Sequence, residues 1–333
     1  MYGPESDGPF HSMSTNMPKH EETSLLTIAQ IRKGPKGEDL YLFNERQRIY
    51  SLSEQAAATA PAMRSLAADA KENEPLQVTL DLERGTVLNL APPPATARTA
   101  FVSERSLLGT PDKVVPIEVS KIDPTSFDVV DLQLKWKAFT LCTKIVPSYA
   151  KAKEIFDFFA SLSCHLPGPP AVPPCIPFQY VRDGCYARAH QMRRLITDRY
   201  GVCCDKVFSF ANKNNDELAV RADKWGGCCV TWWYHVAPLL RVRVTINTTP
   251  KVTLVLAMVI DPGMFNKPVL LSTWLAAQEN KVCSSRAHVS MYSIQPGTAY
   301  APANYAATAF STDPTYAATE STLIAYKNLI TCP

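Results

Sequence analysis

The stretch RDGCYARAHQMRR (182–194) decides how this chain is interpreted, because it places a Gly-Cys step directly before a helical pattern. Apolar residues recur after it with helical spacing at Ala189, Met192, Leu195 and Ile196. Gly201 can end this helix. Cys185 therefore lies in the first turn, where unpaired backbone N–H groups and the positive end of the helix dipole favour a thiolate. The pattern predicts a cysteine nucleophile; the alternative, in a chain with ten cysteines, is a buried or disulfide-bonded residue.

A base and its orienting carboxylate are predicted on one hairpin downstream. Strand-like runs occupy residues 228–246 (CCVTWWYHVAPLLRVRVTI) and 252–263 (VTLVLAMVIDPG), with the turn signal NTTP between them. A turn centred on Thr248 places His235 opposite Asp261 on the same face, within about 2.6–3.2 Å for a hydrogen bond. A register error of one residue would put them on opposite faces. The plainer alternatives are a strand histidine bonded to a backbone group and a turn-forming Asp before Pro.

Three blocks, 175–194 (CIPFQYVRDGCYARAHQMRR), 228–240 (CCVTWWYHVAPLL) and 259–265 (VIDPGMF), resemble the motifs of the bacterial protein-glutaminase family, which deamidates glutamine side chains in proteins. The predicted helix in 144–164 resembles the start of that family's mature enzyme. The resemblance implies a Cys-His-Asp triad: Cys185 as nucleophile, His235 as general base and acid, and Asp261 as the residue that orients His235.

The fold that the resemblance implies is α+β. It has a papain/transglutaminase-like cysteine hydrolase core with an antiparallel sheet and the nucleophile at a helix N-terminus, preceded by a small α+β N-terminal domain. No metal or organic cofactor is implied. The order Cys, His, Asp is shared with cysteine proteases and transglutaminases, so these stay as alternatives. A noncatalytic host-interaction module or an injected effector is a further alternative.

Candidates for substrate binding flank the triad: Gly184, Trp233 and Tyr234. Backbone N–H groups near Gly184 are expected to hold an oxyanion. Strand alternation puts Trp233 on the face of His235, where it would shield the pair or contact substrate, and turns Trp232 and Tyr234 the other way; Tyr234 is kept as a candidate contact. His190 is rejected as the base, because five residues of helix turn it away from Cys185.

The cysteines favour an oxidising destination and a secreted or exported protein, although no classical signal peptide is visible in this chain. Eight cysteines around Cys185, in the second half of the chain, give four possible disulfides: Cys164, Cys175, Cys203, Cys204, Cys228, Cys229, Cys283 and Cys332. Of the pairings we predict only Cys164 with Cys175, which closes a Pro-rich loop. Vicinal Cys-Cys pairs do not match the spacing of a zinc site.

Composition indicates an ordinary globular protein of 333 residues, 46% hydrophobic and 20% charged. The longest apolar run, about ten residues, is too short to span a bilayer, so no membrane partner is expected. A net charge of +3 with dispersed basic residues argues against nucleic acid. Residues 1–150 carry 16 Lys and Arg against 19 Asp and Glu, and residues 151–333 carry 18 against 12, so the two halves are expected to attract each other.

Three segments are predicted. Residues 1–24 form a disordered tail, 25–142 a small domain resembling a pro-region, and 143–333 the protein-glutaminase-like catalytic domain. Short strand runs near 40–43, 78–82 and 86–90 and a helical stretch in 53–70 are expected in the small domain, and 296–322 reads as loop. Family members are made as inactive precursors, so an activating protease is expected to cut between Gly109 and Pro147. Expected substrates are proteins with exposed glutamine.

Overall fold

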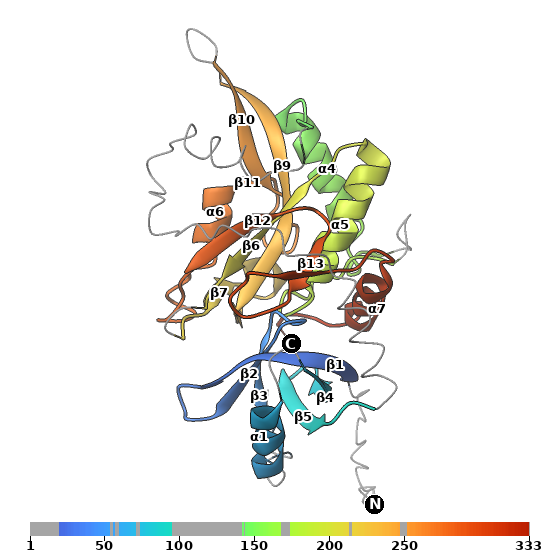
Figure 1. Cartoon of the computed structure of the whole chain (residues 1–333). Helices are drawn as coiled ribbons and strands as arrows, with labels where there is room; N and C mark the ends of the chain where they lie inside the picture. The colour runs from blue at the N-terminus through green and yellow to red at the C-terminus, as the bar shows by residue number, and fades with distance from the viewer. Residues whose placement is uncertain are drawn as a thin grey trace, which may run out of the picture.

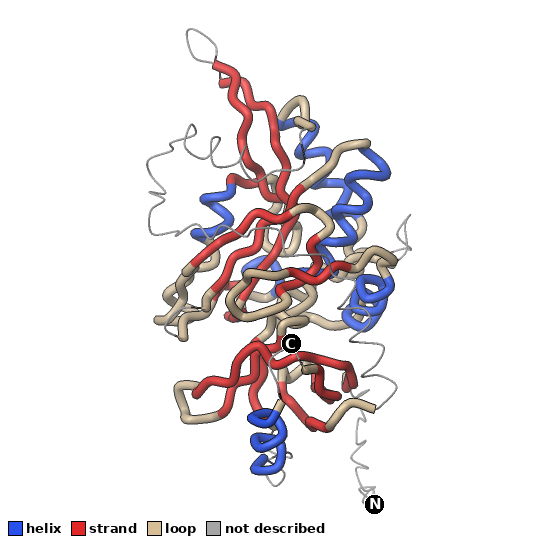
Figure 2. The backbone as a smooth tube through the Cα atoms, viewed as in Figure 1, coloured by secondary structure: helices blue, strands red, loops and turns tan. Residues whose placement is uncertain are grey.

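The structure, a computed structural model, describes residues 20–53, 56, 60–70, 74–94, 142, 144–167, 174–212, 215–246 and 252–332. Two domains follow one another along the chain (Figures 1 and 2): a small barrel domain, residues 20–94, and a larger C-terminal domain, residues 142–332. The predicted turn at 247–250 lies outside the described residues. No helix in the described ranges is both long and apolar enough to cross a bilayer.

The barrel domain is a closed five-stranded barrel in the order β1-β2-β3-β5-β4. Its elements are β1 (Glu21–Lys33), β2 (Asp39–Phe43), β3 (Ile49–Leu52), α1 (Ala60–Asp69), β4 (Pro75–Asp81) and β5 (Thr86–Ala91). Alternate residues of the strands point inward, so that Tyr41, Phe43 and Val78 are fully buried in its core. The three predicted strand runs are confirmed, and the helix predicted in 53–70 is confirmed over Ala60–Asp69. The predicted tail 1–24 is wrong at its end, because Glu21 already opens β1, which pairs with β4.

The C-terminal domain is built on a five-stranded antiparallel sheet in the order β11-β10-β9-β6-β12. Its strands are β6 (Asp205–Phe210), β9 (Tyr234–Ile246), β10 (Val252–Val259), β11 (Val269–Leu270) and β12 (Met291–Gln295). The β9–β10 hairpin pairs Ile246 with Val252 and Leu239 with Val259. The predicted register is therefore wrong: partner numbers are two higher than a turn centred on Thr248 gives. Because the shift is even, it keeps every side chain on its face.

Helices cover both faces of this sheet (Figure 1). On one face α4 (Tyr149–Ser161) and α5 (Cys185–Tyr200) pack on β9, and on the other α6 (Leu271–Ala276) packs on β10 and β11. α4 starts where the Ser148 side chain accepts a hydrogen bond from the Lys151 amide at 3.1 Å. The predicted loop 296–322 is wrong in part, because it contains β13 (Ala299–Pro302), β14 (Phe310–Thr312) and the start of α7 (Ala317–Tyr326), which packs on α5. The remaining elements are β7 (Leu218–Arg221), η3 (Asp223–Trp225) and β8 (Cys229–Trp232).

Four disulfides stabilise the C-terminal domain: Cys142–Cys203, Cys164–Cys175, Cys228–Cys332 and Cys229–Cys283. The predicted Cys164–Cys175 bond is confirmed. The predicted set of eight is wrong at one member, since Cys204 is free and buried while Cys142 takes its place. The sequence could not show which of Cys203 and Cys204 forms a disulfide, because the two residues are adjacent. Cys142 is consequently tied to the C-terminal domain rather than to the barrel.

Candidate active site

Cys185 is the first residue of α5, as the sequence predicts. The preceding Gly184 is left-handed, with φ +81°, and a Cβ there would come within 2.7 Å of the Tyr326 ring, so only glycine fits. The backbone amide of Val236, one residue after His235, hydrogen-bonds the cysteine sulfur. The helix start and the middle of the sheet thus meet at the thiol.

The thiol is buried, and its protonation differs from the expectation. Cys185 is 1% exposed, and burial raises the pKa of its thiol well above the ordinary value, outweighing the nearby Arg188 guanidinium, which lowers it. The predicted preference for thiolate is therefore wrong for this state of the protein, because removal of water disfavours the charged form more than the helix start favours it.

His235 and Asp261 form a buried pair. Imidazole Nε2 lies 2.9 Å from carboxylate Oδ2, and the Trp274 indole N–H donates to the same oxygen at 2.9 Å. The predicted hydrogen bond is confirmed even though the two residues are not directly opposite in the register. Burial lowers the pKa of His235, while the His235 and Trp274 bonds together lower the pKa of Asp261 although burial alone would raise it. The pair is a neutral imidazole bound to a carboxylate, and the other ring nitrogen, Nδ1, is buried without a partner among the described residues.

Two indole rings stack with the imidazole. The Trp232 ring stacks on His235 with centroids 4.5 Å apart, and the Trp274 ring stacks at 5.3 Å. The prediction that Trp233 shares the face of His235 is wrong, because a bend at Trp233 separates β8 from β9 and breaks the alternation. The hairpin pattern could not indicate Trp274, because this residue lies in α6, outside the hairpin.

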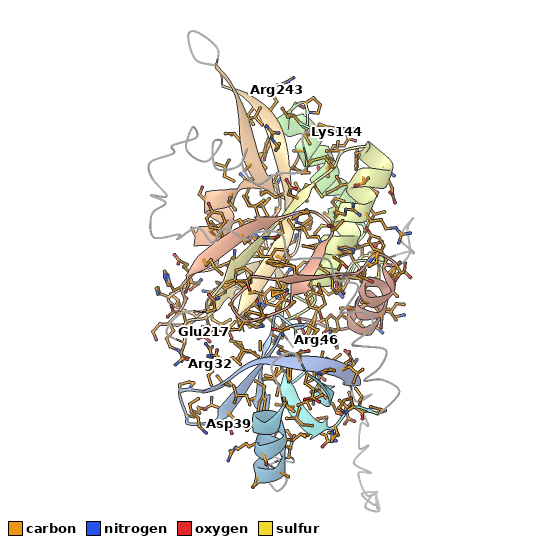
Figure 3. The ribbon with its side chains drawn as sticks, viewed as in Figure 1. Arg32, Asp39, Arg46, Lys144, Glu217 and Arg243 are labelled. Atoms are coloured by element: carbon orange, nitrogen blue, oxygen red, sulfur yellow. A yellow bond between two sulfur atoms is a disulfide. The ribbon has the colours of Figure 1, made fainter. Side chains whose placement is uncertain are left out.

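The barrel domain covers this site with the loop between β2 and β3, residues 44–48 (NERQR), which we call the covering loop. Figure 3 labels Arg46 where the two domains meet. The Trp233 indole donates to the Arg46 carbonyl at 2.7 Å, and its backbone N–H donates to the Gln47 carbonyl at 3.1 Å. Gln47 is fully buried, and its side-chain oxygen accepts the Cys185 backbone N–H at 2.7 Å.

Asp183 is a site residue that the sequence analysis missed. Its carboxylate is fully buried and accepts four hydrogen bonds, two from each domain. The backbone of Gly184 and the Tyr326 hydroxyl donate from the C-terminal domain at 2.7 and 3.0 Å, and the Gln47 amide and the Tyr50 hydroxyl donate from the barrel at 3.1 and 2.7 Å. An Asp-Gly pair before a helix reads as turn chemistry, which hides this role.

The remaining candidates are placed as follows. In this structure Trp233 contacts the covering loop, and Gly184 shapes the helix start. The buried Tyr234 hydroxyl has no hydrogen-bond partner among the described residues and lies close enough to Cys185 for the thiolate charge to help raise the Tyr234 pKa, after burial. His190 faces away and lies 2.7 Å from the Lys206 ammonium. The contact of Gly184, Trp233 and Tyr234 with substrate stays a prediction.

One ion pair between the domains has the opposite sign to the net charges of the two halves. Arg32 of the barrel lies 3.6 Å from Glu217 of the C-terminal domain, which is the reverse of an acidic first half meeting a basic second half. Figure 3 shows both residues at the boundary. The expected attraction between the two halves as a whole stays a prediction.

The glutaminase family model matches residues 152–278, which contain all three triad candidates. No curated protein matches the sequence significantly. A crystal structure of pro-protein-glutaminase is similar over 94% of this chain and 95% of its own, with 22% identity and a TM-score of 0.63, so the two share a fold that includes the barrel domain.

Two structures of protein-glutaminase itself are similar over 56% of this chain and 91% of theirs. One is a crystal structure with 32% identity and a TM-score of 0.47. The other is the NMR structure of protein-glutaminase from Chryseobacterium proteolyticum, with 31% identity and a TM-score of 0.46. On the family match and this identity across nearly the whole of a solved relative, the chain belongs to the protein-glutaminase family.

Proposed function

We propose that the chain hydrolyses the side-chain amide of protein-bound glutamine to glutamate and ammonia, using Cys185, His235 and Asp261. One observation carries the proposal. The Asp261 bond occupies Nε2 of a neutral His235 and leaves Nδ1 as the free nitrogen, one residue before the backbone amide that holds the Cys185 sulfur. A base with one nitrogen oriented and the other free is what a thiol nucleophile requires.

The mechanism has two stages. His235 takes the thiol proton, and the Cys185 sulfur attacks the carboxamide carbon while the Cys185 backbone N–H binds the developing oxyanion. His235 then protonates departing ammonia, which leaves a thioester. His235 next activates a water that hydrolyses the thioester to glutamate, and Asp261 keeps the imidazole in one tautomer throughout. These steps require no metal or organic cofactor.

The barrel domain is proposed to be a pro-region that keeps the enzyme inactive. The covering loop buries the thiol, binds the Cys185 N–H and donates one hydrogen bond to Asp183, and Tyr50 of β3 donates a second. A protein substrate cannot reach the sulfur while this loop is in place, so an activating protease must remove the barrel. The four disulfides are consistent with a secreted enzyme of a bacterial family. We propose that its core is of the papain- or transglutaminase-like cysteine hydrolase type.

Ammonia release tests the function. The full chain and the chain treated with a protease that cuts in 95–141 are each given a glutamine-rich protein. We expect little release from the full chain and rapid release after treatment, without cleavage or crosslinking of the added protein. Fragments of the added protein would indicate a protease, and crosslinked oligomers a transglutaminase.

Cysteine variants identify the nucleophile. Cys185→Ala and His235→Ala are expected to abolish ammonia release while the circular dichroism spectrum stays native. Cys204→Ala is the matched control, since Cys204 is the other free buried cysteine and plays no part in the proposed chemistry. Near-normal release by treated Cys185→Ala would rule out the mechanism.

A further inference from the structure

Gln47 of the covering loop is held as a substrate would be, with each of its four polar groups bound by the C-terminal domain. Its side-chain oxygen accepts the Cys185 N–H at 2.7 Å, and its side-chain nitrogen donates to the Val181 carbonyl at 3.2 Å. Its backbone N–H donates to the Asp183 carboxylate at 3.1 Å, and its backbone carbonyl accepts the Trp233 N–H at 3.1 Å. The residue is 0% exposed.

The neighbours of Gln47 turn away from the nucleophile. The Arg46 guanidinium bonds the Tyr186 hydroxyl and Glu22, and Arg48 donates to the Tyr180 hydroxyl at 3.1 Å. These contacts fix the loop on both sides, so of residues 46–48 it is Gln47 whose side chain reaches the Cys185 amide. The loop thus presents one glutamine side chain to the start of α5, as a protein substrate would have to do.

The Gln47 amide oxygen occupies the position that the mechanism assigns to the oxyanion. It lies 2.7 Å from the N–H of the nucleophile itself, within the range in which such donors act. The carboxamide carbon is one bond from that oxygen. The carbon that Cys185 would attack in a substrate is therefore matched by a carbon of the same chain.

We propose that Gln47 is a modification site: Cys185 deamidates it once, within the chain, and converts it to glutamate. This inference rests on the proposed function. The Cys185 sulfur bonds to the Gln47 carboxamide carbon and the thiol proton passes through His235 to the leaving ammonia. Water then adds to the thioester carbon, the carbon–sulfur bond breaks, and the thiol is restored. Amide and water are consumed, and carboxylate and ammonium are formed.

The conversion of Gln47 to glutamate weakens the binding of the barrel to the active site. A glutamate at position 47 has no N–H to donate to the Val181 carbonyl, and a carboxylate oxygen would face that carbonyl oxygen instead. Losing this bond and leaving an acceptor unpaired is expected to make separation of the domains easier by roughly tenfold. Self-deamidation would thus prepare the precursor for removal of its own pro-region.

Peptide mapping by mass spectrometry of the purified full chain tests the proposal. We expect the peptide that contains position 47 to carry glutamate in wild type, or to show loss of ammonia where the thioester has formed. In Cys185→Ala it should remain glutamine. Gln30 and Gln77 of the same barrel are internal controls and should remain glutamine in both proteins.

The outcomes separate this proposal from the proposed function. One outcome is that protease-treated wild type releases ammonia from an added protein while position 47 of the full chain remains glutamine. Gln47 then blocks the active site without being a substrate, and the inference is wrong. If position 47 is converted in Cys185→Ala as well, the conversion is not catalysed by this site, and the inference is also wrong. If neither reaction occurs, the proposed function fails too.

The loosening is tested separately with Gln47→Glu in the Cys185→Ala background, against Cys185→Ala alone. The Glu variant is expected to be cut by an added protease at roughly ten times the rate when domain opening limits cleavage. Equal rates would overturn the regulatory consequence while leaving the modification itself to stand on the mapping.

Discussion

Replacing Trp274 by Phe is expected to move the acid limb of the activity profile to higher pH. The indole N–H donates to Asp261 Oδ2 at 2.9 Å, the same oxygen that binds His235. A hydrogen bond to a charged group contributes roughly 1.5–3 kcal/mol, and one pKa unit corresponds to about 1.36 kcal/mol. Without this donor the carboxylate becomes more basic, so the limb should rise by roughly one to two units.

The sign follows from the direction of the Asp261 pKa. In the intact site the bonds from His235 and Trp274 lower that pKa, so the carboxylate stays ionised until the pH falls well into the acid range. Trp274→Phe removes one of the two donors, and protonation then starts at higher pH. At neutral pH we expect kcat to fall by roughly tenfold to a hundredfold, because His235 is held less firmly.

Trp232→Phe is the matched control for this prediction. Trp232 also stacks on His235, and its N–H donates to the Val181 carbonyl at 2.9 Å rather than to Asp261. The variant loses a similar ring volume, so packing effects are common to both. The assay is ammonia release by the protease-treated enzyme across pH. Equal movement of the acid limb in both variants, or none in Trp274→Phe, would refute the reasoning.

Two other predictions concern the triad and the processing site. Asp261→Asn should lower kcat by roughly a thousandfold to ten-thousandfold without abolishing it, because it removes the charge that orients His235 but leaves the thiol; a drop of less than tenfold in treated enzyme would contradict the triad. A cut placed after Cys142 should leave the barrel attached through the Cys142–Cys203 disulfide, so non-reducing electrophoresis of the active enzyme should show that its cut lies before Cys142. An active enzyme whose barrel separates only after reduction would contradict this.

Much of the candidate site is readable from the sequence because its signals are local. A glycine before a periodic segment marks the start of α5 at Cys185, and two strand runs joined by a turn bring His235 near Asp261. The even shift in register did no harm to the pair, since faces alternate every residue. Even the Cys164–Cys175 bond is local, closing a short loop.

What the sequence could not provide depends on distant segments. The strand β1 begins in a polar stretch because β4, more than fifty residues later, supplies its partner. Trp274 reaches Asp261 from another element, and the choice between Cys203 and Cys204 is made by where Cys142 lies. The raised pKa of the Cys185 thiol is a further case, since burial causes it and a loop from the other domain contacts the Cys185 amide.

Protection and inactivity share one physical origin in this precursor. A helix start lowers the pKa of a thiol when its N–H groups and nearby water can stabilise the anion. Here the Cys185 N–H is already bound by Gln47, and Cys185 is 1% exposed, so burial raises the thiol pKa instead. The contact that excludes substrates therefore also keeps the nucleophile protonated. Removing the barrel would free the N–H and admit water together, so that added protein substrates gain access and the thiolate becomes more stable in the same step.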